Sequence, residues 1–204
     1  MDAYDELDII RSNLKELLDA RGDDTAYIEE HGSTLDPTKY QTLVALNTDK
    51  TVVFFALTAG AVSALNKAAK NAVAAASDDE KCWWCDATRS DPRGSKVGAT
   101  PTFIVVMNEP PSIAALKFFE SRDFQIFYKK ELMYNPLKHV LVPKHRLLST
   151  AEANTVLKKH SIDNPNKLPI ILKTDVIARW LGVRSGDVVE IERTGGNLFY
   201  RYCV

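Results

Sequence analysis

An unbroken apolar run at residues 52–55, followed by an alanine-rich helical pattern, constrains the fold more than any other feature of the sequence. The run is Val-Val-Phe-Phe, and a strand without polar positions is typical of one that is buried on both faces. In residues 61–76, apolar side chains recur every three or four positions, which predicts a helix with one buried stripe. The stripe consists of Val62, Leu65, Ala69, Val73 and Ala76.

The rest of residues 1–134 continues this alternation of helices and strands. In residues 4–20, apolar side chains recur every three or four positions, which predicts an amphipathic helix with one buried stripe. Asn and Asp at 47–50 predict a turn between two paired strands, and Ser112 is a suitable cap for a later helix. Residues 77–98 have no periodicity and contain Pro92, which predicts a long exposed loop. The predicted elements are helices at 4–20, 61–76 and 113–121 and strands at 40–46, 51–57, 102–107 and 124–129.

A second unit is expected to begin near Asn135-Pro136. Ser149 and Glu152 form a capping-box pattern, in which each side chain satisfies a backbone donor at the start of a helix. Gly195-Gly196-Asn197 predicts a hairpin turn between two strands. The predicted elements are strands at 139–142, 188–193 and 198–204, helices at 150–160 and 176–181, and a loop at 164–166.

The short helix at 176–181 has clear end signals. Thr174 or Asp175 is expected to cap its start, and Gly182 is expected to end it in a left-handed conformation. Ser185-Gly186-Asp187 predicts the turn into the next strand. The sequence therefore predicts an α/β N-terminal domain over residues 1–134 and a small α+β C-terminal domain over residues 135–204.

The two parts carry opposite charge, although the whole chain has a net charge of −1. Residues 1–134 hold 15 basic and 21 acidic side chains, a balance of −6. Residues 135–204 hold 11 basic and 6 acidic side chains, a balance of +5. This asymmetry predicts two units with different partners, and a chance distribution is the alternative.

The cysteines and the start of the chain bear on the compartment. The chain has three cysteines, and an odd number argues against a disulfide scaffold and for a reducing compartment. The first eight residues contain acidic side chains and no basic ones, whereas a secretory signal would begin with basic residues. Lys67 and Lys70 interrupt the apolar stretch at 51–76, so we expect no membrane span.

Cys82-Trp83-Trp84-Cys85 is the first candidate for chemistry. A redox dithiol is expected where a strand leads into a helix, but this motif follows a helix and enters a loop. A zinc site would need two further ligands, and no second paired spacing is present among Cys203 and the histidines. An exposed loop with an aromatic patch is the favoured interpretation, with redox and zinc roles as alternatives.

The other motifs do not support an active site. His139 and His145 flank Pro143, and a structural histidine bonded to a carbonyl is favoured over a metal or acid–base role. Phosphate-binding glycine loops and a nucleophile elbow are absent. The one triplet suited to a metal-dependent nuclease, Asp79-Glu80-Lys81, lies in the predicted loop. We therefore predict no catalytic residue, no metal ligand and no cofactor.

Residues 138–204 carry a series of motifs in a specific order and spacing. They are 139–145 (HVLVPKH), Leu148-Ser149, Glu152, Leu168-Pro169, Asp175, Ala178-Arg179, Leu181-Gly182, Arg184, 186–189 (GDVV), Ile191 and Arg193. Over this stretch the chain resembles the fifth subunit shared by the eukaryotic nuclear RNA polymerases, and the small H protein of archaeal RNA polymerases is the same module without the N-terminal part. The N-terminal part is similar in architecture and in its opening helix.

The chain departs from the family pattern in three places. Ile170 stands where the family usually has Arg, and Val176 follows Asp175 where the family usually has Pro. The serine-rich stretch before the last strand is shortened to residues 194–197. This divergence is typical of a polymerase encoded by a large DNA virus or by a distant eukaryote.

The resemblance implies a non-catalytic subunit of a DNA-dependent RNA polymerase that acts in transcription. It implies that the C-terminal assembly domain docks on the largest subunit. It also implies that the N-terminal domain is a jaw with a nuclease-like core and no active site, beside the downstream DNA. The expected partner-binding residues are His139, Pro143, His145, Asp175, Arg179, Gly182, Gly186, Asp187 and Arg193.

The same resemblance places Pro110, Pro111 and Ser112 next to DNA. A helix N-terminus presents free N–H groups to a phosphate, whereas the carboxylate of Glu109 repels one, so we expect a weak, non-specific contact. Basic residues of the long loop are candidates for a further, salt-dependent contribution. They are Arg89, Arg93 and Lys96.

Two other functions are also compatible with the sequence. One is a free-standing nucleic-acid-binding or regulatory protein that has kept the module, and the other is a redox protein that uses Cys82 and Cys85. The expected location is nuclear for a cellular protein. For a viral protein it is the host cytoplasm or nucleus, and the virion. No membrane partner is expected.

Overall fold

A computed structural model describes residues 3–25, 44–47, 51–74, 102–121 and 123–204. The chain forms two compact units, Met1–Tyr134 and Asn135–Val204. The predicted loop at 77–98, the strand residues 40–43 and most of the turn at 47–50 lie outside the described residues. Each unit has its own sheet and its own core.

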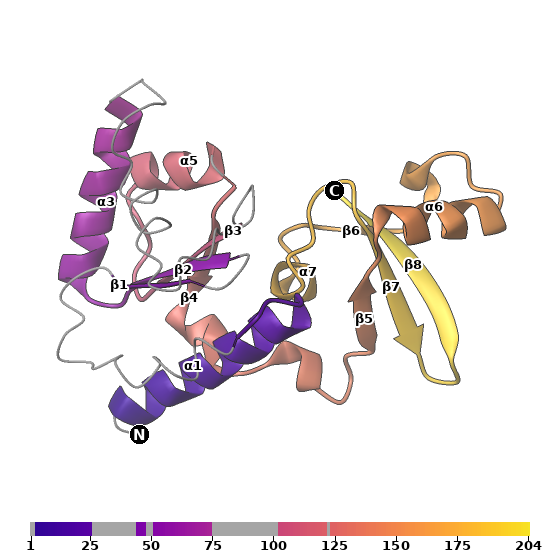
Figure 1. The fold of residues 1–204 in the computed structure, drawn as a ribbon, viewed down its shortest axis with the longest axis horizontal. Helices are drawn as coiled ribbons and strands as arrows, with labels where there is room; N and C mark the ends of the chain where they lie inside the picture. Colours follow the sequence, from indigo (N-terminus) through magenta and orange to yellow (C-terminus); the bar gives the residue numbers. More distant parts are fainter. Residues whose placement is uncertain (1–2, 26–43, 48–50, 75–101, 122) are drawn as a thin grey trace. The chain divides into compact units, whose positions relative to one another are not determined.

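The sheet of the first unit is mostly parallel (Figure 1). Its order is β1-β2-β3-β4, in which β1 pairs antiparallel with β2 and the other pairs are parallel. Parallel neighbours need a crossover connection, and helices α3 and α5 lie in the two crossovers. The bounds are β1 Val44–Asn47, β2 Thr51–Ala56, α3 Ala59–Ala74, β3 Thr102–Met107, α5 Ile113–Ser121 and β4 Gln125–Tyr128.

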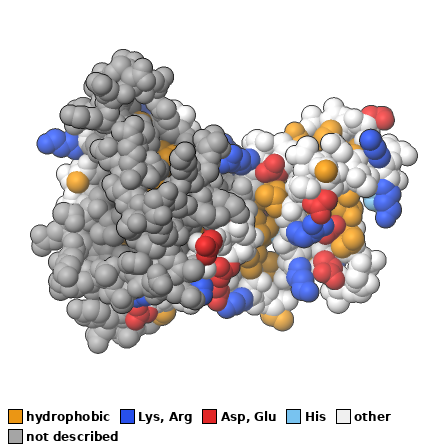
Figure 2. All heavy atoms as spheres, viewed as in Figure 1, with side chains coloured by type: hydrophobic (Ala, Val, Ile, Leu, Met, Phe, Trp, Pro, Cys, Tyr) orange, Lys and Arg blue, Asp and Glu red, His pale blue; other side chains and the backbone are white. Residues whose placement is uncertain are grey.

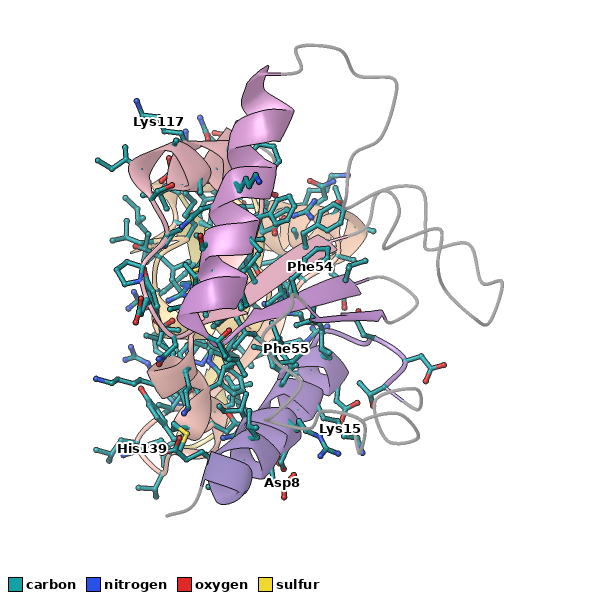
Figure 3. All side chains as sticks on the ribbon, turned by 90° about the vertical axis from the view of Figure 1, so that its left-hand side faces the viewer. Asp8, Lys15, Phe54, Phe55, Lys117 and His139 are labelled. Carbon is teal, nitrogen blue, oxygen red and sulfur yellow. The ribbon has the colours of Figure 1, made fainter. Side chains whose placement is uncertain are left out.

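Helices α3 and α5 cover one face of this sheet. Phe54 of β2 is 1% exposed and lies in the same cluster as Leu65 of α3 and Phe119 of α5. Its ring stacks on Phe103 and Phe124, with ring centroids 6.3 and 6.5 Å away. Alternation along β2 turns Phe55 to the opposite face, and its burial shows that the apolar run is covered on both sides (Figure 3).

Helix α1 (Ala3–Ala20) lies on that opposite face (Figures 1 and 3). Its buried stripe has the predicted helical spacing, and Asp8 points away from it. The 3-10 helix η3 (Lys129–Met133) was not predicted, and it holds α1 through Asn13 Nδ2, which donates to the Leu132 carbonyl at 2.8 Å. An ion pair between Glu6 and Lys129 adds a second link. The stripe consists of Ile10, Leu14, Leu17 and Leu18.

The second unit is built on a sheet with the order β5-β7-β8-β6. Strand β7 pairs antiparallel with β5 and β8, whereas the two-residue β6 runs parallel to β8. The unit has mixed α and β content. The bounds are η4 Pro136–Lys138, β5 Lys144–Leu147, α6 Thr150–Lys159, η5 Pro165–Lys167, β6 Ile170–Ile171, α7 Val176–Trp180, β7 Val188–Arg193 and β8 Asn197–Cys203.

The two helices of the second unit cover opposite faces of its sheet. Val189 and Ile191 of β7 pack with α7 residues, and with Leu137 of η4. Val188, one position along, packs instead with Leu157 of α6. Side chains that alternate along one strand thus belong to two separate clusters, which we call the α7 face and the α6 face.

One predicted strand is wrong. Residues 139–142 form a tight turn, in which the Val142 N–H donates to the His139 carbonyl at 2.9 Å. The strand begins only at Lys144, after Pro143, which has no N–H to offer a ladder. The loop predicted at 164–166 is also more regular than expected, because Asn164 caps the 3-10 helix η5.

Candidate partner-binding surface and DNA-facing loop

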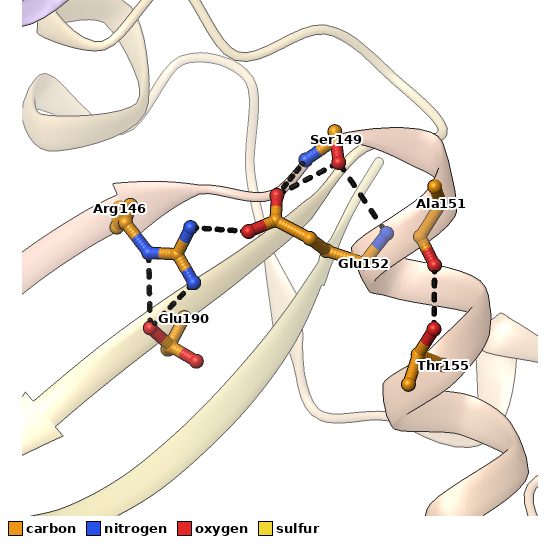
Figure 4. Close-up of polar contacts among 6 residues, drawn as sticks. All are labelled: Arg146, Ser149, Ala151, Glu152, Thr155 and Glu190. Atoms are coloured by element: carbon orange, nitrogen blue, oxygen red, sulfur yellow. Dashed lines mark hydrogen bonds and ion pairs between the residues drawn. The ribbon is translucent and has the colours of Figure 1, made fainter.

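Ion pairs and hydrogen bonds connect the start of α6 to strands β5 and β7 (Figure 4). Glu152 accepts from the backbone N–H and the hydroxyl of Ser149, both at 2.8 Å, which confirms the predicted capping box. Arg146 of β5 donates to Glu152 at 2.7 Å and pairs with Glu190 of β7 at 3.1 Å. The Arg146 guanidinium, with help from Ser149, lowers the pKa of Glu152 from 4.5 to about 2.

The histidine motif forms the entry to β5. His139 Nδ1 accepts the Leu141 N–H at 3.2 Å inside the tight turn. His145 Nδ1 lies 2.7 Å from the Pro143 carbonyl, and a carbonyl only accepts, so this nitrogen carries the proton. His145 is therefore bonded to a carbonyl, as the structural interpretation expects. Its Nδ1 is not available to a metal in this arrangement.

The expected partner-binding residues around α7 shape the helix itself. Asp175 Oδ1 accepts from the Ile177 and Ala178 N–H groups at 2.8 and 3.4 Å, so Asp175 and not Thr174 is the cap. Gly182 ends the helix with φ of 69°, which confirms its predicted left-handed conformation. Arg179 lies on the helix between them and is half-buried.

Gly186, Asp187 and Arg193 lie at the two ends of β7. Gly186 has φ of 100° and donates its N–H to the Cys203 carbonyl at 2.9 Å. Asp187 Oδ2 accepts the Arg184 N–H at 2.8 Å, which closes the turn before the strand. At the far end, the Arg193 guanidinium lies over the Phe199 ring, 4.5 Å from its centroid.

The structure brings several of these residues to one side of the sheet. His145 pairs with Ile191, whose side chain packs in the cluster with α7, and Arg193 follows two positions later on the same face. The α7 face thus carries His145, Arg193 and α7 with its cap. Gly186 and Asp187 lie in the turn at the opposite end of β7 from Arg193.

Exposed aliphatic residues of this unit were missed at the sequence level. Val140 and Leu141 are 92% and 82% exposed, at the tip of the tight turn. The sequence pattern predicts a strand for them, and the one contrary signal is the pair of prolines at 136 and 143 that bracket the segment. Figure 2 shows hydrophobic side chains reaching the surface of the C-terminal unit beside Lys and Arg.

The expected DNA-proximal loop is anchored to α3. The backbone N–H and the hydroxyl of Ser112 both donate to Asn66 Oδ1, at 3.1 and 3.3 Å. Ser112 Oγ also accepts the Ala115 N–H at 3.3 Å, so it caps α5 as predicted. Pro110 and Glu109 are exposed and Pro111 is half-buried, so the loop presents one carboxylate beside a helix N-terminus.

Within the described ranges, no cluster of three or more His, Cys, Asp or Glu side chains is suited to hold a metal ion. The helices described there include none with the length and apolarity needed to cross a bilayer. Cys82, Cys85, the Asp79-Glu80-Lys81 triplet and the basic loop residues lie outside the described residues. Cys203 is buried on the α7 face, and burial raises the pKa of its thiol.

A protein-family model, RNA polymerase Rpb5, C-terminal domain, matches residues 134–203. The DNA-directed RNA polymerase subunit Rpo5 of Nitrosopumilus maritimus is 43% identical over 70 residues, which are 32% of this chain and 83% of that protein. The chain belongs to the Rpb5 family of RNA polymerase subunits. Rpo5 of Pyrococcus horikoshii is likewise 43% identical over 70 residues and is covered to 84% of its length.

The family relationship is carried by the C-terminal unit. DNA-directed RNA polymerase V subunit 5A of Arabidopsis thaliana is 38% identical over 94 residues, which are 45% of this chain and 42% of the plant protein. The match thus spans less than half of this longer relative. The resemblance recognised from the motifs of residues 138–204 is confirmed, and these relatives do not favour a free-standing regulator or a redox protein.

The departures from the family pattern fall at exposed positions. Ile170, where an Arg is usual, is 54% exposed on the short strand β6. Val176, where a Pro is usual, is 43% exposed in the first turn of α7. The shortened stretch at 194–197 forms a tight hairpin between β7 and β8, with Gly195 and Gly196 at φ of 87° and 75°. Both side-chain substitutions therefore place an aliphatic group on the surface.

Proposed function

We propose that this chain is a non-catalytic subunit of a DNA-dependent RNA polymerase that docks on the largest subunit through residues 135–204. The observation that carries the proposal is the 43% identity to archaeal Rpo5 proteins, more than four-fifths of whose length is matched by this unit. Because the match covers most of these small archaeal subunits, their role in the polymerase must depend on residues that correspond to 135–204 of this chain.

The surface chemistry of the C-terminal unit supports docking on a protein. Val140 and Leu141 present aliphatic groups to solvent on a turn that two hydrogen bonds hold in shape. Exposed apolar groups on an ordered scaffold are typical of interaction sites. The expected partner-binding residues build that scaffold: His139 shapes the turn, Asp175 caps α7 and Asp187 closes the turn into β7. We infer that many of them act by positioning the surface.

Residues 1–134 are proposed to form a jaw that borders downstream DNA. In support, strand β3 leads through a short loop into helix α5, and Ser112 caps that helix. The backbone N–H of Ser112 donates to Asn66, which fixes the loop to α3. The N–H groups of the first turn of a helix attract phosphate, while Glu109 opposes it. The proposed contact is weak and independent of base sequence.

The test of the assembly proposal is purification of the chain at native expression level with a tag at residue 1, followed by identification of co-purifying proteins. The C-terminus is avoided because the end of β8 lies in the core, with Cys203 fully buried. Stoichiometric recovery of two very large polymerase subunits is expected. Recovery of the chain alone would overturn the proposal.

The jaw proposal predicts the effect of one charge at the DNA-facing loop. Glu109→Lys removes a repulsive charge, so the assembled polymerase is expected to hold downstream DNA at higher salt than the wild-type enzyme. Glu120→Lys, the same change at the other end of α5, is the matched control. The measurement is the salt concentration at which stalled complexes release DNA. Equal midpoints for the two variants would contradict the proposed position of the loop.

The proposed role also implies a compartment. A polymerase subunit encoded by a eukaryotic cell acts in the nucleus. A subunit encoded by a virus would act where the viral genome is transcribed, in the host nucleus or cytoplasm, and would be carried in the virion if transcription begins there.

A further inference from the structure

The second sheet has an open edge in the described part of the chain. Strand β8 pairs along its length with β7, but β6 covers it only at Tyr202 and Cys203. Residues 197–201 therefore have no second strand beside them among the described residues, and the lower part of β8 in Figure 1 has none beyond it. An uncovered strand edge is a template on which another strand pairs.

Hydrogen bonds at the covered end show which backbone groups face this edge. The Tyr202 N–H donates to the Pro169 carbonyl on the β6 side, whereas the Cys203 N–H donates to the Asp187 carbonyl on the β7 side. Backbone groups alternate in direction along an antiparallel strand. Leu198 and Tyr200 thus direct their N–H and C=O groups to the open edge, and Phe199 directs its own to β7.

Side chains along this edge are apolar and solvent-accessible. Leu198 is 50% exposed on the α6 face and Phe199 is 45% exposed on the α7 face. At the other end, Ile170 is 54% exposed, and its carbonyl accepts from Arg201 Nη1 at 3.1 Å. A strand added here would therefore meet apolar neighbours on both faces as well as free backbone donors and acceptors.

Basic side chains lie beside the open edge and favour a partner strand with acidic side chains. Helix α6 ends with Lys158 and Lys159, which are exposed and have no acidic partner in the described parts, and His160 lies 5.8 Å from the Tyr200 ring. The unit has 6 acidic side chains against 11 basic ones. Glu152, Glu190, Asp163, Asp175 and Asp187 already accept hydrogen bonds or ion pairs within it.

We propose that the open edge of β8 accepts an extended, acidic strand contributed by another polymerase subunit. Main-chain hydrogen bonds to Leu198 and Tyr200 would hold the strand, and the basic end of α6 would select its acidic side chains. This inference rests on the proposed function, because it assigns one binding mode to the subunit within the polymerase.

The decisive test is amide hydrogen exchange, read residue by residue on the free full-length chain and on the chain within the purified polymerase. Assembly is expected to slow exchange at Leu198 and Tyr200 by about 100-fold or more. Phe199 and Arg201, whose amides face β7, should change little. Unchanged exchange at Leu198 and Tyr200 in the assembled enzyme would overturn the proposal. Failure of the chain to join the polymerase at all would instead refute the proposed function.

Amide exchange of the free chain tests whether a second copy or another segment of the same chain covers the open edge instead. Slow exchange at Leu198 and Tyr200 before assembly that becomes faster on dilution would show that a second copy covers the edge. Slow exchange that is independent of concentration would show that another segment of the same chain covers it. Either result contradicts a strand from another subunit.

Two variants test the backbone and the charge separately. Leu198→Pro removes an N–H that points to the open edge, and an edge strand tolerates a proline at such a position. This variant should weaken recovery of the polymerase about fivefold to tenfold more than Leu198→Ala does. The double change Lys158→Glu and Lys159→Glu should reduce recovery of the polymerase, and the reduction should grow as the salt concentration is lowered. Lys144→Glu on the far strand β5 should not reduce recovery. Equal recovery of Leu198→Pro and Leu198→Ala, at matched melting temperature, would exclude strand addition.

Discussion

At the scale of single residues, most of the expected partner-binding positions turn out to have a structural task. Asp175 satisfies the first donors of α7, Gly182 and Gly186 adopt positive φ, and Asp187 closes a turn. Their residue types are explained by the fold before any partner is considered. The side chains free to contact a partner are others, such as Leu141 and Leu198.

Glu152 gives the clearest prediction at this scale. Its pKa is lowered to about 2, so its ionised form stabilises the folded state in full above pH 4.5, and that contribution is lost as the pH falls towards 2. Glu152→Gln keeps an oxygen for the Ser149 N–H but removes the charge. We expect a lower melting temperature for this variant at pH 7 and a difference from wild type that shrinks between pH 5 and pH 2.

The measurement for Glu152 is thermal unfolding followed by circular dichroism across that pH range. The control is Glu192→Gln, which removes another carboxylate from the same sheet at an exposed site. A constant difference between Glu152→Gln and wild type at every pH would show that the charge of Glu152 does not stabilise the fold.

At the scale of elements, local patterns predicted those that have a clear period or a cap. The stripe of α1, the apolar run of β2 and the capping box of α6 can each be recognised within one short segment of the sequence. The segment at 139–142 was mispredicted because its apolar residues are those of a strand, whereas the hydrogen bond between Val142 and His139 makes it a turn. Strand β6 was missed because two residues carry no period.

The candidate site was predictable only in part, for a related reason. Motif spacing indicates which residues matter to the family, but not whether each one contacts a partner or shapes the backbone. That distinction depends on pairing between strands far apart in sequence, such as His145 with Ile191. The open edge of β8 is likewise a property of sheet order, which no single segment encodes.

Strand β2 offers a prediction about the first unit. Phe54 is 1% exposed, stacks on Phe103 of β3 and on Phe124 just before β4, and lies in one cluster with residues of α3 and α5. Phe54→Ala should lower the free energy of unfolding by about 3–5 kcal/mol, because it leaves a cavity in this cluster. Phe54→Leu, which fills more of the space, should cost less. Urea unfolding would measure both, and equal losses would show that the cluster relaxes around the gap.

At the scale of the whole molecule, the chain joins two units of opposite charge, each with a separate core. Residues 135–204 form a sheet covered on both faces by their own helices. Archaeal relatives that are matched over 83% and 84% of their length by this unit show that a chain of nearly this size exists alone. We therefore expect the C-terminal unit to fold independently.

We accordingly predict that residues 135–204, produced alone, unfold cooperatively on heating and give a dispersed amide spectrum. The reason is that the α6 and α7 faces are both filled by side chains of the unit itself, including Leu137 and Leu157. Nuclear magnetic resonance and differential scanning calorimetry would test this. A broad, non-cooperative transition would mean that the first unit contributes to the stability of the second.

The place of β8 in its sheet has a consequence for biosynthesis. Strand β8 lies between β7 and β6, and its residue Cys203 packs in the core, yet it leaves the ribosome after every other described element of the chain. The first unit can fold during translation, but the second cannot complete its sheet until residue 203 has emerged. A chain whose synthesis stops early would carry a formed N-terminal unit but would lack the surface proposed for assembly. On that proposal, incomplete subunits would be excluded from the polymerase without any separate proofreading step.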